Sequence, residues 1–122
     1  MYVDTESGEV PLYDLIYVSV ATQDLTLDEL KALVKKARSR NENREVTGLL
    51  AYDEVNRSFV QILEGPRKAV LDIFDIIEKD DRHNDIRVLR QGDRDPPDRR
   101  FGDWNMALVE PAYFKAIVFE HL

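Results

Sequence analysis

The run Leu12–Ala21, LYDLIYVSVA, constrains the fold of this chain more than any other segment. It is rich in aromatic and β-branched residues and apolar on both alternating faces, which is typical of a strand in the centre of a sheet. Side chains alternate along a strand. One face therefore carries Leu15, Tyr17 and Ser19, and the other carries Ile16, Val18 and Val20.

The rest of the chain predicts two main helices and four more strands. Thr26 and Glu29 form a capping box before a helix that runs to about Arg40. Apolar runs at 45–53 and 58–64 predict a hairpin, and Gly65-Pro66 precedes a second helix that ends near Lys79. The last two strands are expected at 86–91 and 101–109, and a short C-terminal helix at 111–122.

This order of elements predicts an α+β fold. It matches a ferredoxin-like sandwich, β-α-β-β-α-β-β, with a mixed five-stranded sheet, two helices on one face and the short C-terminal helix in addition. The first and third strands are neighbours in that topology, so Tyr17 and Gln61 should lie side by side. We expect an N-terminal extension at 1–11, one domain at 12–109, and a tail or the start of an output helix at 110–122.

Composition narrows the function classes. A chain of 122 residues with 43% hydrophobic residues suits one domain with one modest core. It has no cysteine, which excludes disulfides and thiolate chemistry and favours the cytoplasm. The net charge of -7 argues against nucleic acid as a partner. No apolar stretch approaches the roughly 20 residues of a membrane span, so no membrane association is expected.

Gln61 is the polar exception in an apolar strand, FVQILEG. A buried amide without hydrogen-bond partners costs about 1 to 3 kcal/mol, so a polar group must meet it. The Tyr17 hydroxyl and loop backbone could form a purely structural network with Gln61. Alternatively, both residues face a ligand held between the helices and the sheet. The residues alone leave both interpretations open.

Two further pairs have both a structural and a functional interpretation. Asn41 stands where it could cap the first helix, yet it adjoins Arg40 near the sheet face that carries Tyr17. Trp104 and Met106 are two residues apart in the expected last strand and should therefore share a face. They could simply fill the core, or they could form a mobile gate.

The run DDRH follows the second helix. Its basic residues, Arg82 and His83, could simply favour the helix dipole at a solvated helix end. A weaker alternative is a divalent-metal site, for which no other segment supplies a carboxylate at fixed spacing. The candidate ligands of that site are Asp80, Asp81, His83 and Asp85.

Five segments carry a family resemblance. LIYVSVA, RSRNENREVTGLLAY, FVQILEG, DDRH and RRFGDWNM occur in the order and approximate separations of the BLUF (blue light using flavin) family. The chain resembles that family from about residue 12 to residue 109. One difference is the hairpin turn between the second and third strands, which lacks the usual glycine and is about two residues longer.

The resemblance assigns expected roles position by position. Tyr17 is similar to the photoactive tyrosine and Gln61 to the switching glutamine. Asn41 corresponds to the asparagine that binds the pyrimidine edge of the flavin, and Arg40 is a candidate flavin contact. The remaining matches are Asp80, Arg82 and His83 near the flavin, and Trp104 and Met106 in signalling.

The resemblance also implies a function. It predicts a blue-light receptor that binds oxidised flavin, most readily FAD, with FMN or riboflavin as alternatives. In the family, electron and proton transfer from the tyrosine through the glutamine rearranges the flavin hydrogen bonds and shifts the spectrum slightly to the red. We expect no catalytic output from this chain, but a downstream protein effector or a missing effector domain, and a homo-oligomer formed through the apolar sheet face or the tail.

Three other functions fit the sequence less well than a light sensor. A ferredoxin-like acyl-phosphate hydrolase could use Arg40 and Asn41, but the five glycines form no phosphate-binding cluster. A Ser-His-Asp hydrolase lacks a nucleophile elbow. A ligand-free interaction module leaves the polar Gln61 in an apolar strand without an explanation.

Overall fold

The computed structural model describes residues 11–94, 97–102 and 104–121. The expected N-terminal extension therefore lies outside the described residues, apart from its last position. None of the described helices is long and apolar enough to cross a membrane. The elements follow one another as β1 (Leu12–Ala21), α2 (Leu27–Glu42), β2 (Thr47–Asp53), β3 (Ser58–Gly65), α3 (Arg67–Glu78), β4 (His83–Arg94), β5 (Ala107–Val109) and α4 (Pro111–His121).

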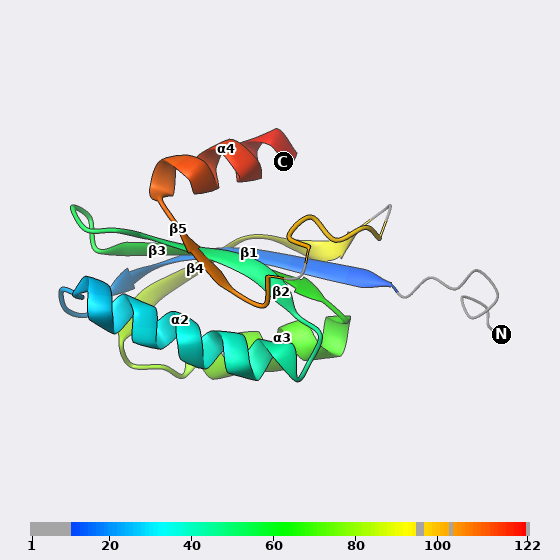
Figure 1. Cartoon of the computed structure of the whole chain (residues 1–122), viewed down its shortest axis with the longest axis horizontal. Helices are drawn as coiled ribbons and strands as arrows, with labels where there is room; N and C mark the ends of the chain where they lie inside the picture. Colours follow the sequence, from blue (N-terminus) through cyan, green and yellow to red (C-terminus); the bar gives the residue numbers. More distant parts are fainter. Residues whose placement is uncertain (1–10, 95–96, 103, 122) are drawn as a thin grey trace, which may run out of the picture.

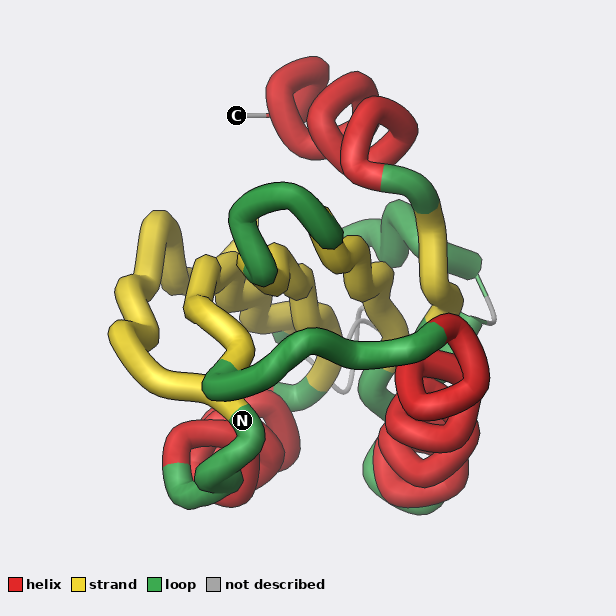
Figure 2. The backbone as a smooth tube through the Cα atoms, turned by 90° about the vertical axis from the view of Figure 1, so that its left-hand side faces the viewer, coloured by secondary structure: helices red, strands yellow, loops and turns green. Residues whose placement is uncertain are grey.

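The strands form one mixed five-stranded sheet in the order β4-β1-β3-β2-β5. β1 runs antiparallel to both β3 and β4, β2 runs antiparallel to β3, and β5 runs parallel to β2. α2 and α3 cover one face of the sheet and α4 lies over the other (Figure 1). Figure 2 shows the two main helices side by side below the strands, with α4 alone above them. The predicted sandwich is confirmed, with β1 and β3 at its centre.

The capping box predicted before α2 is confirmed. The backbone N–H of Glu29 donates to the Thr26 hydroxyl at 3.1 Å, and the Thr26 N–H donates to the Glu29 carboxylate at 2.9 Å. The helix then buries a stripe at helical spacing, which consists of Leu30, Val34, Ala37 and Asn41. Because Asn41 continues the apolar stripe, the helix directs this polar side chain toward the sheet.

The sheet separates two hydrophobic cores. The core between the sheet and the helices α2 and α3 contains Tyr13, Leu15, Tyr17 and Ala21 of β1. The core below α4 contains Ile16, Leu49, Ala51, Ile62, Phe101 and Phe114. Phe114 is only 2% exposed, so α4 covers part of the apolar face that the sequence indicated.

Two strands, β4 and β5, have boundaries that differ from the prediction by more than two residues. β4 is longer than expected and runs from His83 to Arg94. The last strand was predicted over 101–109 but contains only Ala107–Val109. Gly102 adopts a φ of 52°, a left-handed conformation that ends an extended segment, and the N–H of Trp104 donates back to the Phe101 carbonyl at 2.9 Å. Residues 101–106 therefore form a loop rather than a strand, as far as they are described.

Candidate functional site

Tyr17 and Gln61 lie directly opposite each other on β1 and β3, as strand phase predicted. The Tyr17 hydroxyl donates a hydrogen bond to Oε1 of Gln61. Both side chains are 3% exposed, so this bond forms away from bulk water. The two adjacent central strands fix the spacing of the pair.

The other end of the Gln61 amide meets the loop before β5. Nε2 of Gln61 donates to the sulfur of Met106 at 3.5 Å. A thioether sulfur is a weak acceptor, so this contact holds the amide less firmly than an oxygen would. Tyr17, Gln61 and Met106 thus form a chain of hydrogen bonds in which the amide accepts at one end and donates at the other.

The environment of Tyr17 keeps its hydroxyl protonated. Burial raises the pKa of the phenol far above its usual value near 10, and the charge of Asp80 raises it further, whereas the charge of Arg40 opposes this shift. The ring of Phe74 packs against the phenol with 5.5 Å between centroids. Tyr17 is therefore a rigid hydrogen-bond donor at neutral pH.

His83 is fixed between two oxygens. One ring nitrogen, Nε2, lies 2.7 Å from the carbonyl of Ile77, which can only accept a hydrogen bond, so Nε2 must donate. In the neutral ring Nδ1 then accepts from the Ser19 hydroxyl at 2.7 Å. This arrangement holds the imidazole 6.2 Å from the Tyr17 ring centroid. The structure therefore places His83 beside the photoactive candidate.

Asp80 and Arg82 form an ion pair beside this group. Nε of Arg82 donates to both carboxylate oxygens of Asp80, at 2.9 and 3.0 Å, and Nη2 makes a third contact. Hydrogen bonding by Arg82 lowers the pKa of Asp80 to about 2. The Arg82 side chain is 47% exposed, so the pair borders solvent as well as the interior.

Asn41 connects α2 to the loop before β5. Its side chain is fully buried, and Nδ2 donates to the Asn105 carbonyl at 2.7 Å, while Arg40 donates to its Oδ1 at 3.3 Å. Asn43, not Asn41, is the C-cap of the helix. The interpretation of Asn41 as a simple cap is therefore wrong.

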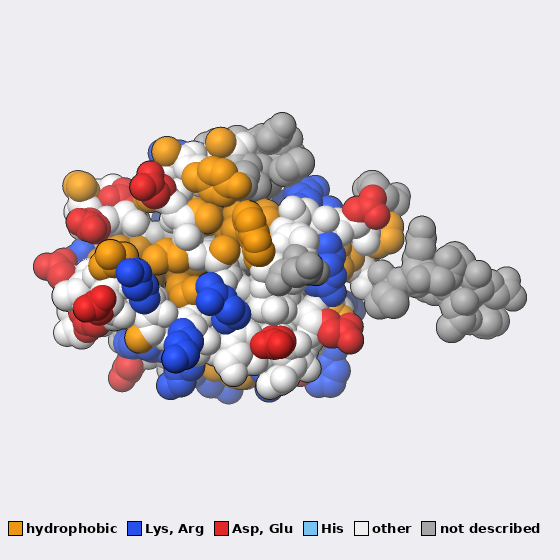
Figure 3. All heavy atoms as spheres, viewed as in Figure 1, with side chains coloured by type: hydrophobic (Ala, Val, Ile, Leu, Met, Phe, Trp, Pro, Cys, Tyr) orange, Lys and Arg blue, Asp and Glu red, His pale blue; other side chains and the backbone are white. Residues whose placement is uncertain are grey.

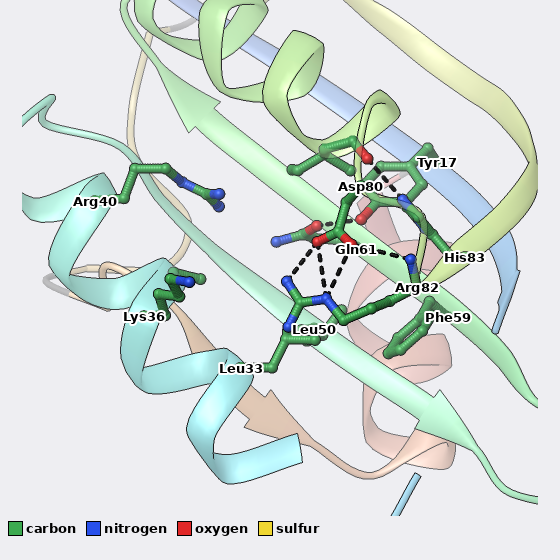
Figure 4. A pocket seen from close by; sticks show the side chains of 12 residues that line it. Tyr17, Leu33, Lys36, Arg40, Leu50, Phe59, Gln61, Asp80, Arg82 and His83 are labelled. Carbon is green, nitrogen blue, oxygen red and sulfur yellow. Dashed lines mark hydrogen bonds and ion pairs between the residues drawn. The ribbon is translucent and has the colours of Figure 1, made fainter. Parts of the chain in front are cut away.

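Most of these side chains line one open cleft between α2 and the end of α3 (Figure 4), but Asn41 and Met106 are not among its lining residues. Its apolar walls come from Leu33, Ala37, Leu50, Phe59 and Ile77, and its polar lining from Tyr17, Lys36, Arg40, Gln61, Asp80, Arg82 and His83. Apolar walls with convergent polar groups suit a small-molecule ligand. Arg82 is paired with Asp80, so Lys36 and Arg40 are the cations that suit an anionic group on that ligand.

Lys36 is not among the site residues predicted from the sequence, because its position in the helical pattern places it on the solvent-facing side of α2. It is exposed, but it also lines the cleft. The signal that could have identified it is its spacing of four residues from Arg40, which places both side chains on one side of the helix.

Trp104 and Met106 do not share an environment, contrary to the prediction. Met106 is 1% exposed and contacts Gln61, whereas Trp104 is 47% exposed. Strand alternation does not apply because both residues precede β5. In Figure 3, hydrophobic side chains gather where β5 leads into α4, and Trp104 borders a shallow hollow there with Leu108 and Tyr113.

The metal alternative gains no support from the described part of the chain. No group of three or more His, Asp or Glu side chains there could hold a metal ion. Within the DDRH run, the carboxylate of Asp80 is engaged by Arg82, and both ring nitrogens of His83 have partners.

The comparison with protein families decides the assignment. The family model described as "BLUF: Sensors of blue-light using FAD" matches residues 12–107. The chain belongs to the BLUF family. The expectation from the five sequence segments is confirmed, and the hydrolase and ligand-free alternatives are not supported. BLUF domains are flavin-binding blue-light sensors that signal to effectors.

Similar proteins and similar solved structures support the assignment to the BLUF family. The photoactivated adenylate cyclase subunit beta of Euglena gracilis is 39% identical over 83 residues, which are 68% of this chain and 9% of that protein. The dark-state structure of BlrB, a BLUF protein, superposes with a TM-score of 0.76 at 30% identity and covers 90% of this chain and 80% of BlrB. Klebsiella pneumoniae BlrP1 with FMN and cyclic diGMP gives a TM-score of 0.72 at 33% identity, over 81% of this chain and 26% of BlrP1.

Proposed function

We propose that this chain is a blue-light receptor domain in which Tyr17 and Gln61 form the light-responsive pair beside a bound flavin. The observation that carries the proposal is the hydrogen-bond chain from the Tyr17 hydroxyl through the Gln61 amide to Met106. It is buried, Tyr17 and Gln61 line the cleft, and the Gln61 amide can reverse its donor and acceptor ends.

The flavin would lie in the cleft between α2 and α3. Apolar wall residues such as Leu33 and Phe59 suit the faces of the ring system. Asn41 is not among the residues that line the cleft, but it is hydrogen-bonded to Arg40, which is, and the family resemblance supports a contact of Asn41 with the pyrimidine edge. Lys36 and Arg40 supply positive charge for phosphate groups. These cations favour FAD or FMN over riboflavin, and the description of the family favours FAD.

The flavin, when bound, supplies light absorption and takes up an electron and a proton. Tyr17 holds the proton to be transferred because its raised pKa keeps the phenol neutral. Gln61 carries the switch, since turning its amide exchanges the acceptor now facing Tyr17 for a donor. The Met106 sulfur resists this turn only weakly. No residue needs to leave the site.

The signal would leave the chain through another protein or domain. The chain spans 9% of the length of the Euglena relative, whose name includes a cyclase activity. We propose that residues 12–109 are the sensor domain and that this chain has a sensory and not a catalytic role. The helix α4, which follows this domain, would lead toward the effector. The absence of cysteine supports a cytoplasmic location. Self-association stays a prediction, with the partly exposed Val18 and Val20 as its apolar surface.

The test is a visible absorption spectrum of the purified chain before and after blue light. The protein is saturated in turn with FAD, FMN and riboflavin, and the flavin retained after gel filtration is quantified. We expect retention of a phosphate-bearing flavin and a small red shift that reverses in the dark. A chain that retains none of the three flavins, or a bound flavin whose spectrum light leaves unchanged, would contradict the proposal.

A further inference from the structure

The loop that brings Met106 to Gln61 is fixed on the opposite face of the sheet. We call its described residues, 97–102 and 104–106, the β4–β5 loop. The carboxylate of Glu64 on β3 accepts hydrogen bonds from the backbone N–H groups of Arg100, at 3.1 Å, and Phe101, at 3.0 Å. Two consecutive N–H groups on one carboxylate fix both the position and the orientation of the loop backbone.

Glu64 is fully buried, and two side chains complete its hydrogen bonding. Thr47 on β2 donates to Oε1 at 2.8 Å, and Arg94 on β4 donates to Oε2 at 2.7 Å. A buried carboxylate is unfavourable unless its charge and its acceptor sites are matched. Here four donors match them, and each comes from a different position on β2, on β4 or in the loop.

The neighbouring buried carboxylate shows that burial alone does not produce this arrangement. Asp14 lies directly opposite Glu64 across β1 and β3. Within the described part of the chain, neither oxygen of Asp14 has a hydrogen-bond partner, and its ion pairs to Nε of Arg94 and Nε of Arg90 span 3.7 and 3.8 Å. Of the two carboxylates, Glu64 is therefore the one that holds the β4–β5 loop.

The far end of the loop lies against the proposed switch. The Met106 sulfur accepts from Gln61, its carbonyl accepts from Arg38 at 3.0 Å, and the adjacent Asn105 carbonyl accepts from Asn41. Gln61 and Glu64 belong to the same strand, three residues apart, and therefore point to opposite faces of the sheet. One strand thus contacts both ends of the loop.

We propose that Glu64 is a positioning residue of the light switch. By accepting hydrogen bonds from the N–H groups of Arg100 and Phe101, it fixes the position of the β4–β5 loop. The loop in turn holds the Met106 sulfur where it accepts from the Gln61 amide in the dark state. This inference rests on the proposed role of Gln61. It adds a control point on the sheet face opposite the flavin cleft, in a residue that touches neither flavin nor Tyr17.

The test compares Glu64→Gln with Ile62→Val in the flavin-loaded chain. Gln keeps the size of Glu64 but turns one acceptor oxygen into a donor. Ile62 lies on the same strand and the same face and is 2% exposed, so Ile62→Val loosens that core without removing a loop hydrogen bond. Two dark measurements address the loop directly. One is amide hydrogen exchange at Arg100 and Phe101, and the other is acrylamide quenching of Trp104, the single tryptophan of the chain.

In Glu64→Gln we expect hydrogen exchange at the Arg100 and Phe101 amides to be about tenfold faster than in Ile62→Val. A factor of this size corresponds to the loss of one charge-assisted hydrogen bond. Trp104 should be quenched more readily. The return from the red-shifted state should slow about threefold, because the resting position of Met106 is less favoured. Exchange, quenching and return equal to those of Ile62→Val would overturn the proposal.

A second variant covers the case in which Glu64→Gln fails to fold. Thr47→Val removes one donor to Glu64 and keeps the carboxylate, but the Thr47 hydroxyl also accepts from Arg99 of the loop at 3.0 Å. The variant is therefore made in an Arg99→Leu background, where, compared with Arg99→Leu alone, it should shift the same measurements in the same direction by a smaller factor. No shift of Thr47→Val in that background would count against the proposal. The two dark measurements need no photocycle. A parent chain without a red shift would therefore contradict the proposed function, whereas unchanged exchange would contradict the role of Glu64.

Discussion

The Gln61 amide donates to the Met106 sulfur across 3.5 Å, in a part of the chain where neither side chain is more than 3% exposed. This contact joins the central strand β3 to the loop before β5. If the Gln61 amide rotates, its oxygen instead of its N–H group faces the Met106 sulfur, and the hydrogen bond to the loop is lost. Rotation of the amide therefore changes the contact with the loop directly.

Met106→Leu tests this contact. Leucine has a similar volume but no acceptor, so the amide loses its partner while the packing is largely kept. We expect flavin binding and the red shift to remain, and the dark return to slow by about threefold, the effect of one weak hydrogen bond. The measurement is the decay of the red-shifted absorbance. Leu63→Met, a substitution of the same kind on β3, should leave the decay unchanged, and an equal effect of both variants would contradict this role of Met106.

Asn41→Ala tests the link between α2 and the flavin. The substitution leaves the Asn105 carbonyl without its donor, which should lower the free energy of unfolding by about 1 to 3 kcal/mol. Flavin affinity should fall by about tenfold, the effect of one lost hydrogen bond to the ligand. Fluorescence titration with flavin measures the second effect. Asn43→Ala, at the exposed helix end, is the control, and Asn41→Ala with the parent's affinity would remove Asn41 from the site.

Asp80→Asn tests the ion pair beside the cleft. The pKa of Asp80 is lowered from 3.8 to about 2 in the folded state, so the stability that the pair contributes is present above pH 4 and is lost as the pH falls toward 2. Because the pair is partly exposed, we expect less than about 1 kcal/mol. Urea unfolding at pH 6 and pH 3 measures it. Because pH 3 lies between the unfolded and the folded pKa, the parent chain should lose part of this increment there, a loss that Asp80→Asn should not show. An equal loss in both would contradict the assignment.

Phe114→Ala tests the role of α4. Phe114 is 2% exposed in the core opposite the cleft, so its truncation should lower the free energy of unfolding by about 3 to 5 kcal/mol. The absorption maximum of the flavin should not move, because the sheet separates the two cores. Tyr113→Ala removes a 48% exposed ring from the same helix and serves as the control. A loss of stability no larger than in this control would show that α4 does not cover the sheet.

The parts of the site that were predictable from the sequence depend on local periodicity. Strand alternation and the order of elements were enough to bring Tyr17 opposite Gln61. Asn41 could be placed only near the same sheet face, because the predicted helix ended at about Arg40, whereas the helix runs to Glu42 and buries Asn41. These rules need only neighbouring residues. The flavin itself came from the family resemblance and not from periodicity.

The loop before β5 was not predictable in the same way. Its apolar residues suggested a strand, but its backbone is bound by distant groups, namely Arg38, Asn41, Gly48 and Glu64. Such long-range hydrogen bonds leave no periodic signal in the sequence. For this reason the expected pairing of Trp104 with Met106 on one face was wrong, while the burial of Met106 beside Gln61 emerged only from the structure.

The central claim is that Tyr17 and Gln61 together form the light switch. Its most direct test is the light-minus-dark absorption spectrum of the flavin-loaded parent chain beside Tyr17→Phe and Gln61→Leu. Tyr17→Phe keeps the aromatic ring and Gln61→Leu keeps a side chain of similar volume. Each removes one partner of the buried hydrogen bond between the two residues. We predict that both retain flavin, that the parent gives a reversible red shift, and that neither variant does. A normal, reversible shift in either variant would contradict the account.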